Sequence, residues 1–130
     1  MILSSRGRVH KQGLLDNIVE CQLSTQVMDK RVYGVYAGDE LINNRQIAHC
    51  AAVGEGSILV STINGEPENG DYLCSSPICG LAQLQPDDLL HNYTVAKLIE
   101  DVNWSAVSRY ISHEGNEYKV ALVACSYHCS

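Results

Sequence analysis

The sequence predicts an all-β fold, either a compact β-sandwich or a closed β-barrel of about ten short strands with little helix. Short runs of β-branched and aromatic residues recur, and Gly, Asn, Asp or Pro interrupts them every eight to twelve residues or so. Only "DDLLHN" and "NWSAVSR" have the composition of a helical turn. Because 130 residues is the length of one domain, we expect residues 1–130 to form a single domain.

Ten segments fit strands by their length, their composition and the turn residues between them. In chain order they are Ile2–Ser5, Ile18–Leu23, Val32–Ala37, Ile47–Val53, Ser57–Ile63, Asp71–Ser75, Leu81–Gln85, Tyr93–Glu100, Arg109–Ser112 and Tyr118–Ser126. Asn64-Gly65 predicts a type I′ turn, whose twist suits a two-residue hairpin. Gly115-Asn116 predicts a second hairpin, because both residue types adopt positive φ at low cost.

The segment "ENGDYLCSSPICG" (68–80) predicts a strand flanked by two turns. Gly70-Asp71 turns the chain into the strand, and Asp71 can accept hydrogen bonds from nearby backbone N–H groups. "SSPICG" ends the strand, and Gly80 allows a tight return because glycine adopts positive φ. We therefore interpret this segment as part of the framework of the fold.

The charge pattern argues against nucleic acid and membranes as partners. The net charge is −6, and the acidic residues are spread singly, with no basic stripe and no interleaved aromatics. The first residues, "MILSSRGRVHKQG", lack the long apolar core and cleavage site of a secretory signal. No apolar run approaches the ~20 residues that a membrane helix needs.

Six cysteines occur, at positions 21, 50, 74, 79, 125 and 129. Without a secretion signal, reduced thiols are expected, although a Cys74–Cys79 disulfide is geometrically possible in the presence of an oxidant. Three of the six, Cys21, Cys50 and Cys125, have apolar neighbours and are expected to be buried as small hydrophobic residues.

Two cysteines and the C-terminal His-Cys pair are candidate metal ligands. Cys74, Cys79, His128 and Cys129 would together supply a tetrahedral Cys₃His zinc site. The spacing argues against it, because structural sites favour a tighter Cys-x₂-Cys knuckle and adjacent residues of a strand point to opposite faces. We predict no metal or other cofactor and keep a zinc-stabilised binding module as an alternative.

No standard catalytic signature is present. The sequence lacks a Gly-x-Ser-x-Gly elbow and a dinucleotide-binding fingerprint, and the five histidines are scattered. Asp87-Asp88 is a paired-acid or calcium motif in form, but two carboxylates in a polar loop are usually solvated. The residues alone therefore predict no catalytic site.

Three stretches resemble a viral domain. They are "DKRVYGVYAG" (29–38), "VGEGSILVSTINGEPENGDYLCSSPICGLAQLQPDDLLHNYTVAKLIEDV" (53–102) and "YKVALVACSYHC" (118–129). They are similar to a β-rich domain at the C-termini of phage tail fibres and tail spikes, which is also found in structural proteins of large eukaryotic DNA viruses. The intramolecular-chaperone autocleavage domain of tail spikes is a similar domain. The run from "NGDYL" to "NYTVAK" is the most specific part.

The resemblance implies a virion structural protein, a capsid decoration or a tail or fibre component, made in the host cytoplasm and located in the virion. It implies a homo-oligomer, a trimer in the fibre-like case, that docks to other virion structural proteins. The alternative role is a self-cleaving chaperone domain. Since the chain begins at Met1 directly before the strands and residues 1–28 do not match the autocleavage motif, we expect no upstream peptide to cut and no enzymatic activity.

Large aromatic residues are the candidate contacts for self-association. Tyr33, Tyr36, Tyr72 and Trp104 are the candidate interface anchors, because aromatic side chains dominate contact energy. The alternative is a place in the core, since the chain has no Phe and a single Trp, and we expect at least half of the four to be core residues.

Overall fold

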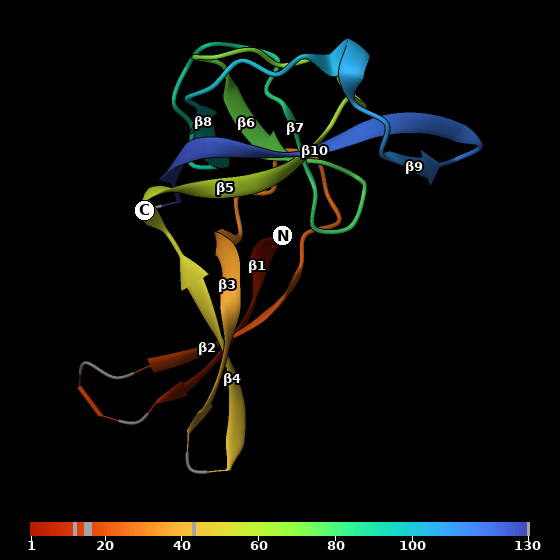
Figure 1. The fold of residues 1–130 in the computed structure, drawn as a ribbon. Helices are drawn as coiled ribbons and strands as arrows, with labels where there is room; N and C mark the ends of the chain where they lie inside the picture. Colours follow the sequence, from red (N-terminus) through yellow and green to blue (C-terminus); the bar gives the residue numbers. More distant parts are fainter. Residues whose placement is uncertain (12, 15–16, 43, 130) are drawn as a thin grey trace.

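The computed structural model describes residues 1–11, 13–14, 17–42 and 44–129. Within these residues it confirms the predicted all-β class, with ten strands in two sheets (Figure 1). The strands are β1 (Ile2–Lys11), β2 (Asn17–Leu23), β3 (Val32–Ile42), β4 (Arg45–Ala51), β5 (Val53–Ser61), β6 (Tyr72–Ser75), β7 (Ala82–Leu84), β8 (Thr94–Leu98), β9 (Tyr110–His113) and β10 (Asn116–His128). Each predicted strand overlaps one of them.

The six-stranded sheet closes on itself. Its order is β5-β7-β6-β8-β10-β9, and β5 also pairs with β10. This additional pairing runs from Val120↔Ser61 to His128↔Val53, while the other edge of β10 pairs with β8 and β9. The ring β5-β7-β6-β8-β10 is therefore continuous and forms the body of the protein. β9 extends away from this body as a short hairpin with β10 (Figure 1).

One apolar cluster fills the body and the base of the second sheet. Its buried members are Ile2, Val32, Val35, Ile58, Val60, Leu73, Ala82, Val95, Ala96, Leu98, Trp104, Val123 and Cys125. They come from strands that are far apart in the sequence, so the core forms only when both ends of the chain meet. The predicted burial of Cys125 is confirmed, since its side chain is fully buried.

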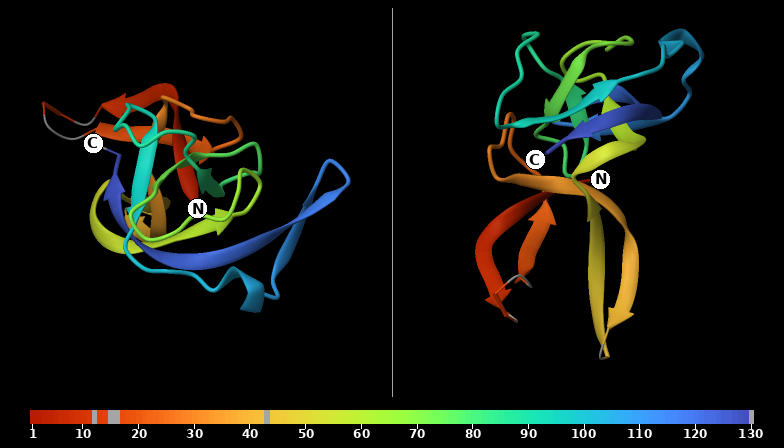
Figure 2. Two further views of the ribbon diagram at one scale, coloured as in Figure 1. Left: turned by 90° about the horizontal axis from the view of Figure 1, so that it is seen from above. Right: turned by 90° about the vertical axis from the view of Figure 1, so that its left-hand side faces the viewer.

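The four-stranded sheet, in the order β2-β1-β3-β4, consists of two hairpins that project from the body (Figures 1 and 2). β1 and β3 pair only near the body, from Ile2↔Val35 to Ser4↔Val32, and the hairpins diverge beyond that point. Each hairpin contains a bulge, with Gly7 (φ 81°) in one and Gly38 (φ 116°) in the other. Bulges of this kind bend a strand and increase its twist.

β1 and β3 are longer than predicted, ending at Lys11 and Ile42 instead of Ser5 and Ala37. The additional residues are mostly polar and exposed, so they lack the apolar alternation on which the strand prediction depended. They remain extended because the partner strand of each hairpin supplies the backbone hydrogen bonds.

A polar junction ties the hairpins to the body. The buried carboxylate of Asp29 accepts hydrogen bonds from Ser4 in β1 and from the backbone and guanidinium of Arg31. The backbone N–H of Asp29 donates to Oγ of Ser75 at the end of β6, and this hydroxyl donates to the Gln26 carbonyl at 2.6 Å. The end of the strand predicted within residues 68–80 is therefore one of the places where the body contacts the hairpins.

Both predicted turns of that segment are confirmed. The Asp71 carboxylate accepts a hydrogen bond from the backbone N–H of Glu68 at 2.8 Å. Gly80 has a φ of 74°, and its N–H donates to the Ser24 carbonyl while its carbonyl accepts from Ile2. The tight return after β6 therefore also positions the start of β1.

Two turn predictions need correction. Asn64-Gly65 does not form a two-residue hairpin, because β7 lies between β5 and β6, and Asn64 instead donates its side-chain amide to the Leu84 carbonyl. The β9–β10 hairpin is confirmed, but its positive-φ residues are Glu114 and Gly115, while Asn116 already pairs with His113. The strand order of the sheet excludes the first hairpin, and the second turn lies one residue earlier than predicted.

The helical content is as low as predicted. Within the described residues the helical element is one 3-10 turn at Trp104–Ala106, in the predicted "NWSAVSR" segment, and the "DDLLHN" segment forms bends. None of the described segments is a helix of the length and apolarity that crossing a membrane requires.

Candidate interaction site

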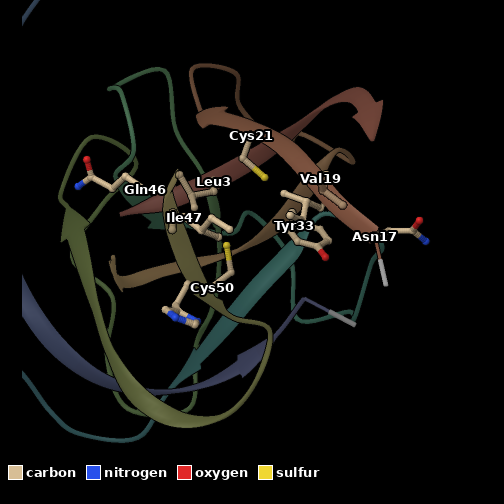
Figure 3. A pocket seen from close by; sticks show the side chains of 11 residues that line it. Leu3, Asn17, Val19, Cys21, Tyr33, Gln46, Ile47 and Cys50 are labelled. Carbon is tan, nitrogen blue, oxygen red and sulfur yellow. The ribbon is translucent and has the colours of Figure 1, made fainter. Parts of the chain in front are cut away.

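An apolar groove lies on the four-stranded sheet. It has a volume of about 440 Å³ and is formed by side chains from both hairpins (Figure 3). The lining residues are Leu3, Asn17, Ile18, Val19, Cys21, Tyr33, Gln46, Ile47, Ala48, His49 and Cys50. Ile47 and Val19, from opposite hairpins, are half-buried, which leaves apolar surface in contact with solvent. The two hairpins thus present a partly open apolar face.

Gly34 in β3 is the residue that lets β4 approach the sheet so closely. A Cβ atom built at Gly34 would lie 2.9 Å from Cβ of Cys50 and 3.0 Å from the Ala51 carbonyl oxygen. Both distances are shorter than an ordinary carbon contact, so no other residue fits without a shift of β4. A glycine inside a strand is compatible with close backbone approach, but Gly34 alone does not say which strand approaches it.

Gly34→Ala is expected to destabilise the fold by about 1–3 kcal/mol, because the added methyl group overpacks the contact with Cys50. Chemical denaturation of the single variant measures the loss. In the double variant Gly34→Ala/Cys50→Gly the colliding Cβ is removed, so its loss should be smaller than the sum of the two single losses. Strictly additive losses would contradict the contact.

The two hairpins that form the groove differ in charge. The β1–β2 hairpin exposes Arg6, Arg8 and Lys11, of which Arg8 lies 3.6 Å from Glu20. The β3–β4 hairpin exposes Asp39 and Glu40 on β3, with Arg45 at the start of β4. Asp39 accepts a hydrogen bond from Gln46, and Glu40 pairs with His49. The exposed charges of β1 are therefore basic and those of β3 acidic, although the first hairpin also contains Asp16 and Glu20.

The candidate aromatic anchors occupy different environments. Tyr33 lines the groove and is 42% exposed, and Tyr36, in the same strand, is 37% exposed. A hydrogen bond with Asp39 is the main cause that raises the pKa of Tyr36. Tyr72 is half-buried away from the groove, with its ring edge-on to His128 and 5.9 Å from Nζ of Lys97. Tyr33 and Tyr36 thus remain candidate anchors.

Trp104 does not lie at the surface, so its assignment as an interface anchor is corrected. Its side chain is 6% exposed and belongs to the core cluster. The indole Nε1–H donates to the Pro67 carbonyl at 2.9 Å, and the Trp104 carbonyl accepts from Nζ of Lys119. The indole is the largest apolar group in the chain and closes one side of the body, which is the core role considered as the alternative.

The four candidate zinc ligands are not brought together. Cys74 is buried in β6, Cys79 is exposed in the following turn, and His128 and Cys129 are at the end of β10. Within the described residues no group of three or more His, Cys, Asp or Glu side chains is placed to hold a metal ion. The structure therefore does not support the alternative of a zinc-stabilised module, which requires all four ligands around one metal ion.

The cysteines differ in burial. Burial raises the pKa of Cys74 to about 11 and that of Cys125 to about 12, so both are protonated at neutral pH. Cys21 and Cys50 are only half-buried at the groove, which corrects the prediction that they are core residues. That prediction relied on their apolar neighbours, which here line an open surface.

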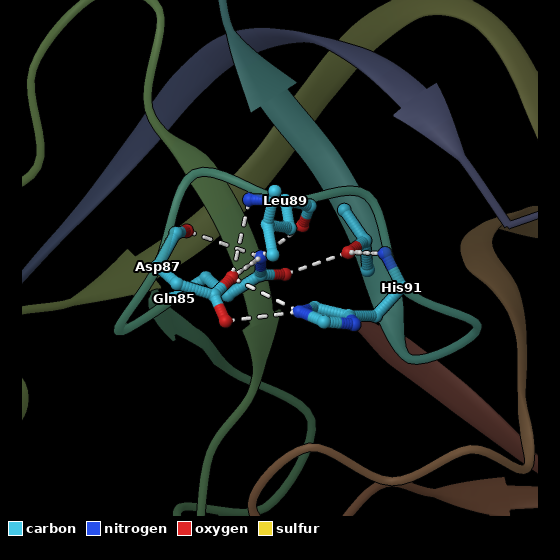
Figure 4. Close-up of polar contacts among 5 residues, drawn as sticks. Gln85, Asp87, Leu89 and His91 are labelled. Atoms are coloured by element: carbon cyan, nitrogen blue, oxygen red, sulfur yellow. Dashed lines mark hydrogen bonds and ion pairs between the residues drawn. The ribbon is translucent and has the colours of Figure 1, made fainter.

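A second polar cluster holds the loop between β7 and β8 (Figure 4). The buried Gln85 amide donates to the Leu89 carbonyl at 2.7 Å and accepts at Oε1 from the Thr94 hydroxyl at 2.6 Å. Nε2 of His91 lies 2.9 Å from Oδ2 of Asp87, and this contact is the main cause that lowers the pKa of Asp87. The side chains of the loop therefore hold it in place, and the Asp87 carboxylate has its hydrogen-bond partners within the loop.

This cluster has the Asp–His pair of a catalytic site but not its nucleophile. Within the described residues no hydroxyl or thiol forms a hydrogen bond with the His91 ring, which stacks on Tyr93 with centroids 4.6 Å apart. His91 and Cys129 both line a second cavity of about 400 Å³. Burial raises the pKa of Cys129 to about 11, so its thiol is not activated at neutral pH.

The i,i+4 spacing of Asp87 and His91 is a feature of the sequence that could have indicated this pair. The sequence has no comparable signal for the contact between Gln85 and Thr94, because that contact depends on β7 and β8 lying in one sheet. Among the described residues, the features left open to solvent are the apolar groove and the charged side chains of the two hairpins. No family model, curated protein or solved structure matches this chain.

Proposed function

We propose that this chain is a structural subunit of a virus particle, part of a capsid decoration, tail or fibre, and that it self-associates through the groove and the two hairpins. The viral setting is supported by the resemblance of residues 29–38, 53–102 and 118–129. The observation that carries the self-association is the apolar groove formed by Val19 and Ile47 with their neighbours on two projecting hairpins.

The solvent-accessible surface area of the chain supports the proposal that another protein surface covers these hairpins. A compact monomer of 14.3 kDa exposes about 6,800 Å². This chain exposes 7670 Å², so its excess is roughly 900 Å². A standard protein interface buries about 800 Å² on each partner. The excess therefore has the size of one ordinary interface, and Leu41 (70% exposed) lies on the β3–β4 hairpin.

The charge difference between the hairpins favours a second copy as the partner. The basic strand β1 of one copy matches the acidic strand β3 of the next. Such a contact joins two different surfaces, and it closes into a ring when the rotation between copies divides a full turn. A trimer is the smallest ring of this kind and the state that the resemblance implies, with docking to other virion proteins through the remaining surface.

Ile47→Asp is the test of this assembly. A carboxylate in the groove would lose its hydration on contact with a second copy, so we expect the variant to run as a monomer of 14.3 kDa in sedimentation analysis. The unmodified chain should sediment at three times that mass. Because Ile47 is only half-buried, the variant should keep the β-sheet circular dichroism spectrum.

Leu122→Asp is the matched control, since Leu122 is 65% exposed on β10, outside the groove. It should leave the trimer intact. A monomeric unmodified chain would refute the self-association, and a trimer disrupted by the control but not by Ile47→Asp would place the interface elsewhere. The virion role is tested separately by mass spectrometry of purified particles, where absence of the chain would contradict it.

A further inference from the structure

Two cysteines from different hairpins line the same groove. Cys21 belongs to β2 and Cys50 to β4, the two edge strands of the four-stranded sheet, with β1 and β3 between them. Side chains on such edges are normally far apart. Here the sheet is bent so strongly that both residues line one cavity, and their sulfur atoms point into it (Figure 3). The absent Cβ of Gly34 is what admits Cys50 to this position.

We propose that Cys21 and Cys50 form a reversible disulfide that joins the two hairpins, with glutathione disulfide as the oxidant. One thiolate attacks glutathione disulfide, releases one glutathione and forms a mixed disulfide. The second thiolate then attacks the cysteine sulfur of that mixed disulfide and releases a second glutathione. The two protons leave with the glutathione thiolates, and the two electrons reduce the glutathione disulfide.

The surroundings of the pair favour this link over the others available. Both side chains line the same groove. Burial raises the pKa of both thiols, and Cys50 adds to the rise at Cys21. Both are half-buried and free, as reaction with a small oxidant requires. The third nearby thiol, Cys129, is directed toward the body, where its Sγ lies 3.6 Å from the Val95 carbonyl oxygen.

The consequence is mechanical. The disulfide would close a loop of residues 21–50, which contains the bulge of β3, the Gly34 contact and the Asp29 junction. A link across a loop of this length restricts the unfolded chain, and we expect the oxidised protein to melt on the order of 10 °C above the reduced protein. Since both cysteines belong to one chain, the link does not depend on the self-association proposed above.

Peptide mapping of the full chain tests the link. The reduced protein is incubated with glutathione disulfide, free thiols are alkylated, and the chain is cut after Lys, Arg and Glu. These cuts place Cys21 in residues 21–30 and Cys50 in residues 46–55, apart from the other four cysteines. We expect these two peptides to be joined within a chain that runs as a monomer on a non-reducing denaturing gel, and to separate on reduction.

Two variants control for oxidation in general. Cys21→Ser should abolish both the joined peptides and the rise in Tm, whereas Cys79→Ser should retain both, because Cys79 is exposed in a separate turn. In the unmodified chain Cys79 also reports that the oxidant has reacted. Glutathione left on Cys21 or Cys50, a Cys50–Cys129 link, a link between chains, or joined peptides without a rise in Tm would each overturn the proposal.

Discussion

Trp104→Ala is expected to lower the free energy of unfolding by about 3–5 kcal/mol, a large part of the stability of a domain of this size. The indole is 6% exposed, and its removal leaves a cavity in the core. It also leaves the Pro67 carbonyl without its hydrogen-bond donor. Because Trp104 is the single tryptophan, the unfolding of both proteins must be followed by circular dichroism instead of fluorescence.

The two contributions of the indole can be separated. Trp104→Phe keeps an aromatic ring but loses the N–H donor to Pro67, so we expect a smaller loss of about 1–3 kcal/mol. Tyr110→Ala, at a residue that is 53% exposed, should change stability by no more than about 0.5 kcal/mol. If Trp104→Ala lost no more than Tyr110→Ala, the assignment of Trp104 to the core would be wrong.

Asp29→Asn is expected to destabilise the junction between the hairpins and the body by about 2–3 kcal/mol. The Asp29 carboxylate is 5% exposed and accepts charge-assisted hydrogen bonds from Arg31 at 2.9 and 3.1 Å, together with one from Ser4. An amide at this position would direct N–H groups at one of these donors. The matched control is Asp88→Asn, the same change in an exposed loop, which should have little effect.

The same residue predicts how stability depends on pH. Burial alone would raise the pKa of Asp29, but the hydrogen bonds from Arg31 and Ser4 outweigh it, so the pKa lies below its ordinary value. A carboxylate with a lowered folded pKa stabilises the fold fully above its unfolded pKa of about 3.9. This stabilisation is lost as the pH falls through the folded pKa.

Unfolding experiments across this acidic range test the assignment. The difference in free energy of unfolding between the unmodified protein and Asp29→Asn should be constant near neutral pH and shrink below about pH 4. A difference that stays constant through the acidic range would show that the Asp29 charge does not stabilise the junction.

The local signals of the sequence were sufficient for the elements of this fold. Runs of β-branched residues between turn residues located all ten strands of the described structure, because each run has the composition of a half-buried strand. The Gly70-Asp71 corner and the Gly80 return were predictable because Gly and Asp favour turns locally, and hydrogen bonds to distant residues add to them in the fold. The Asn64-Gly65 hairpin failed because strand order depends on contacts beyond the turn.

The candidate site was less accessible to the sequence. Apolar neighbours of Cys21 and Cys50 are the same whether a strand faces a core or an open groove, so burial was predicted for both. Trp104 was expected to be either an interface anchor or a core residue. The sequence could not decide between these two roles, because the buried hydrogen bond from its indole to the Pro67 carbonyl joins residues far apart in the chain. At least half of the four aromatic candidates were expected in the core, but Trp104 is the buried one, while Tyr33 and Tyr36 are exposed beside a groove that was not foreseen.

By itself the sequence determined the all-β class, the strand positions and the turns that neighbouring residues make. These depend on side-chain period and on glycine, which act over a few residues. Only the tertiary structure decided that the body closes through β5 and β10, and that Asp29 meets Ser4 and Ser75. It also decided that Gly34 admits β4 and thereby brings Cys21 and Cys50 into one groove. These contacts join residues far apart in the chain, and no local pattern of residues encodes such pairings.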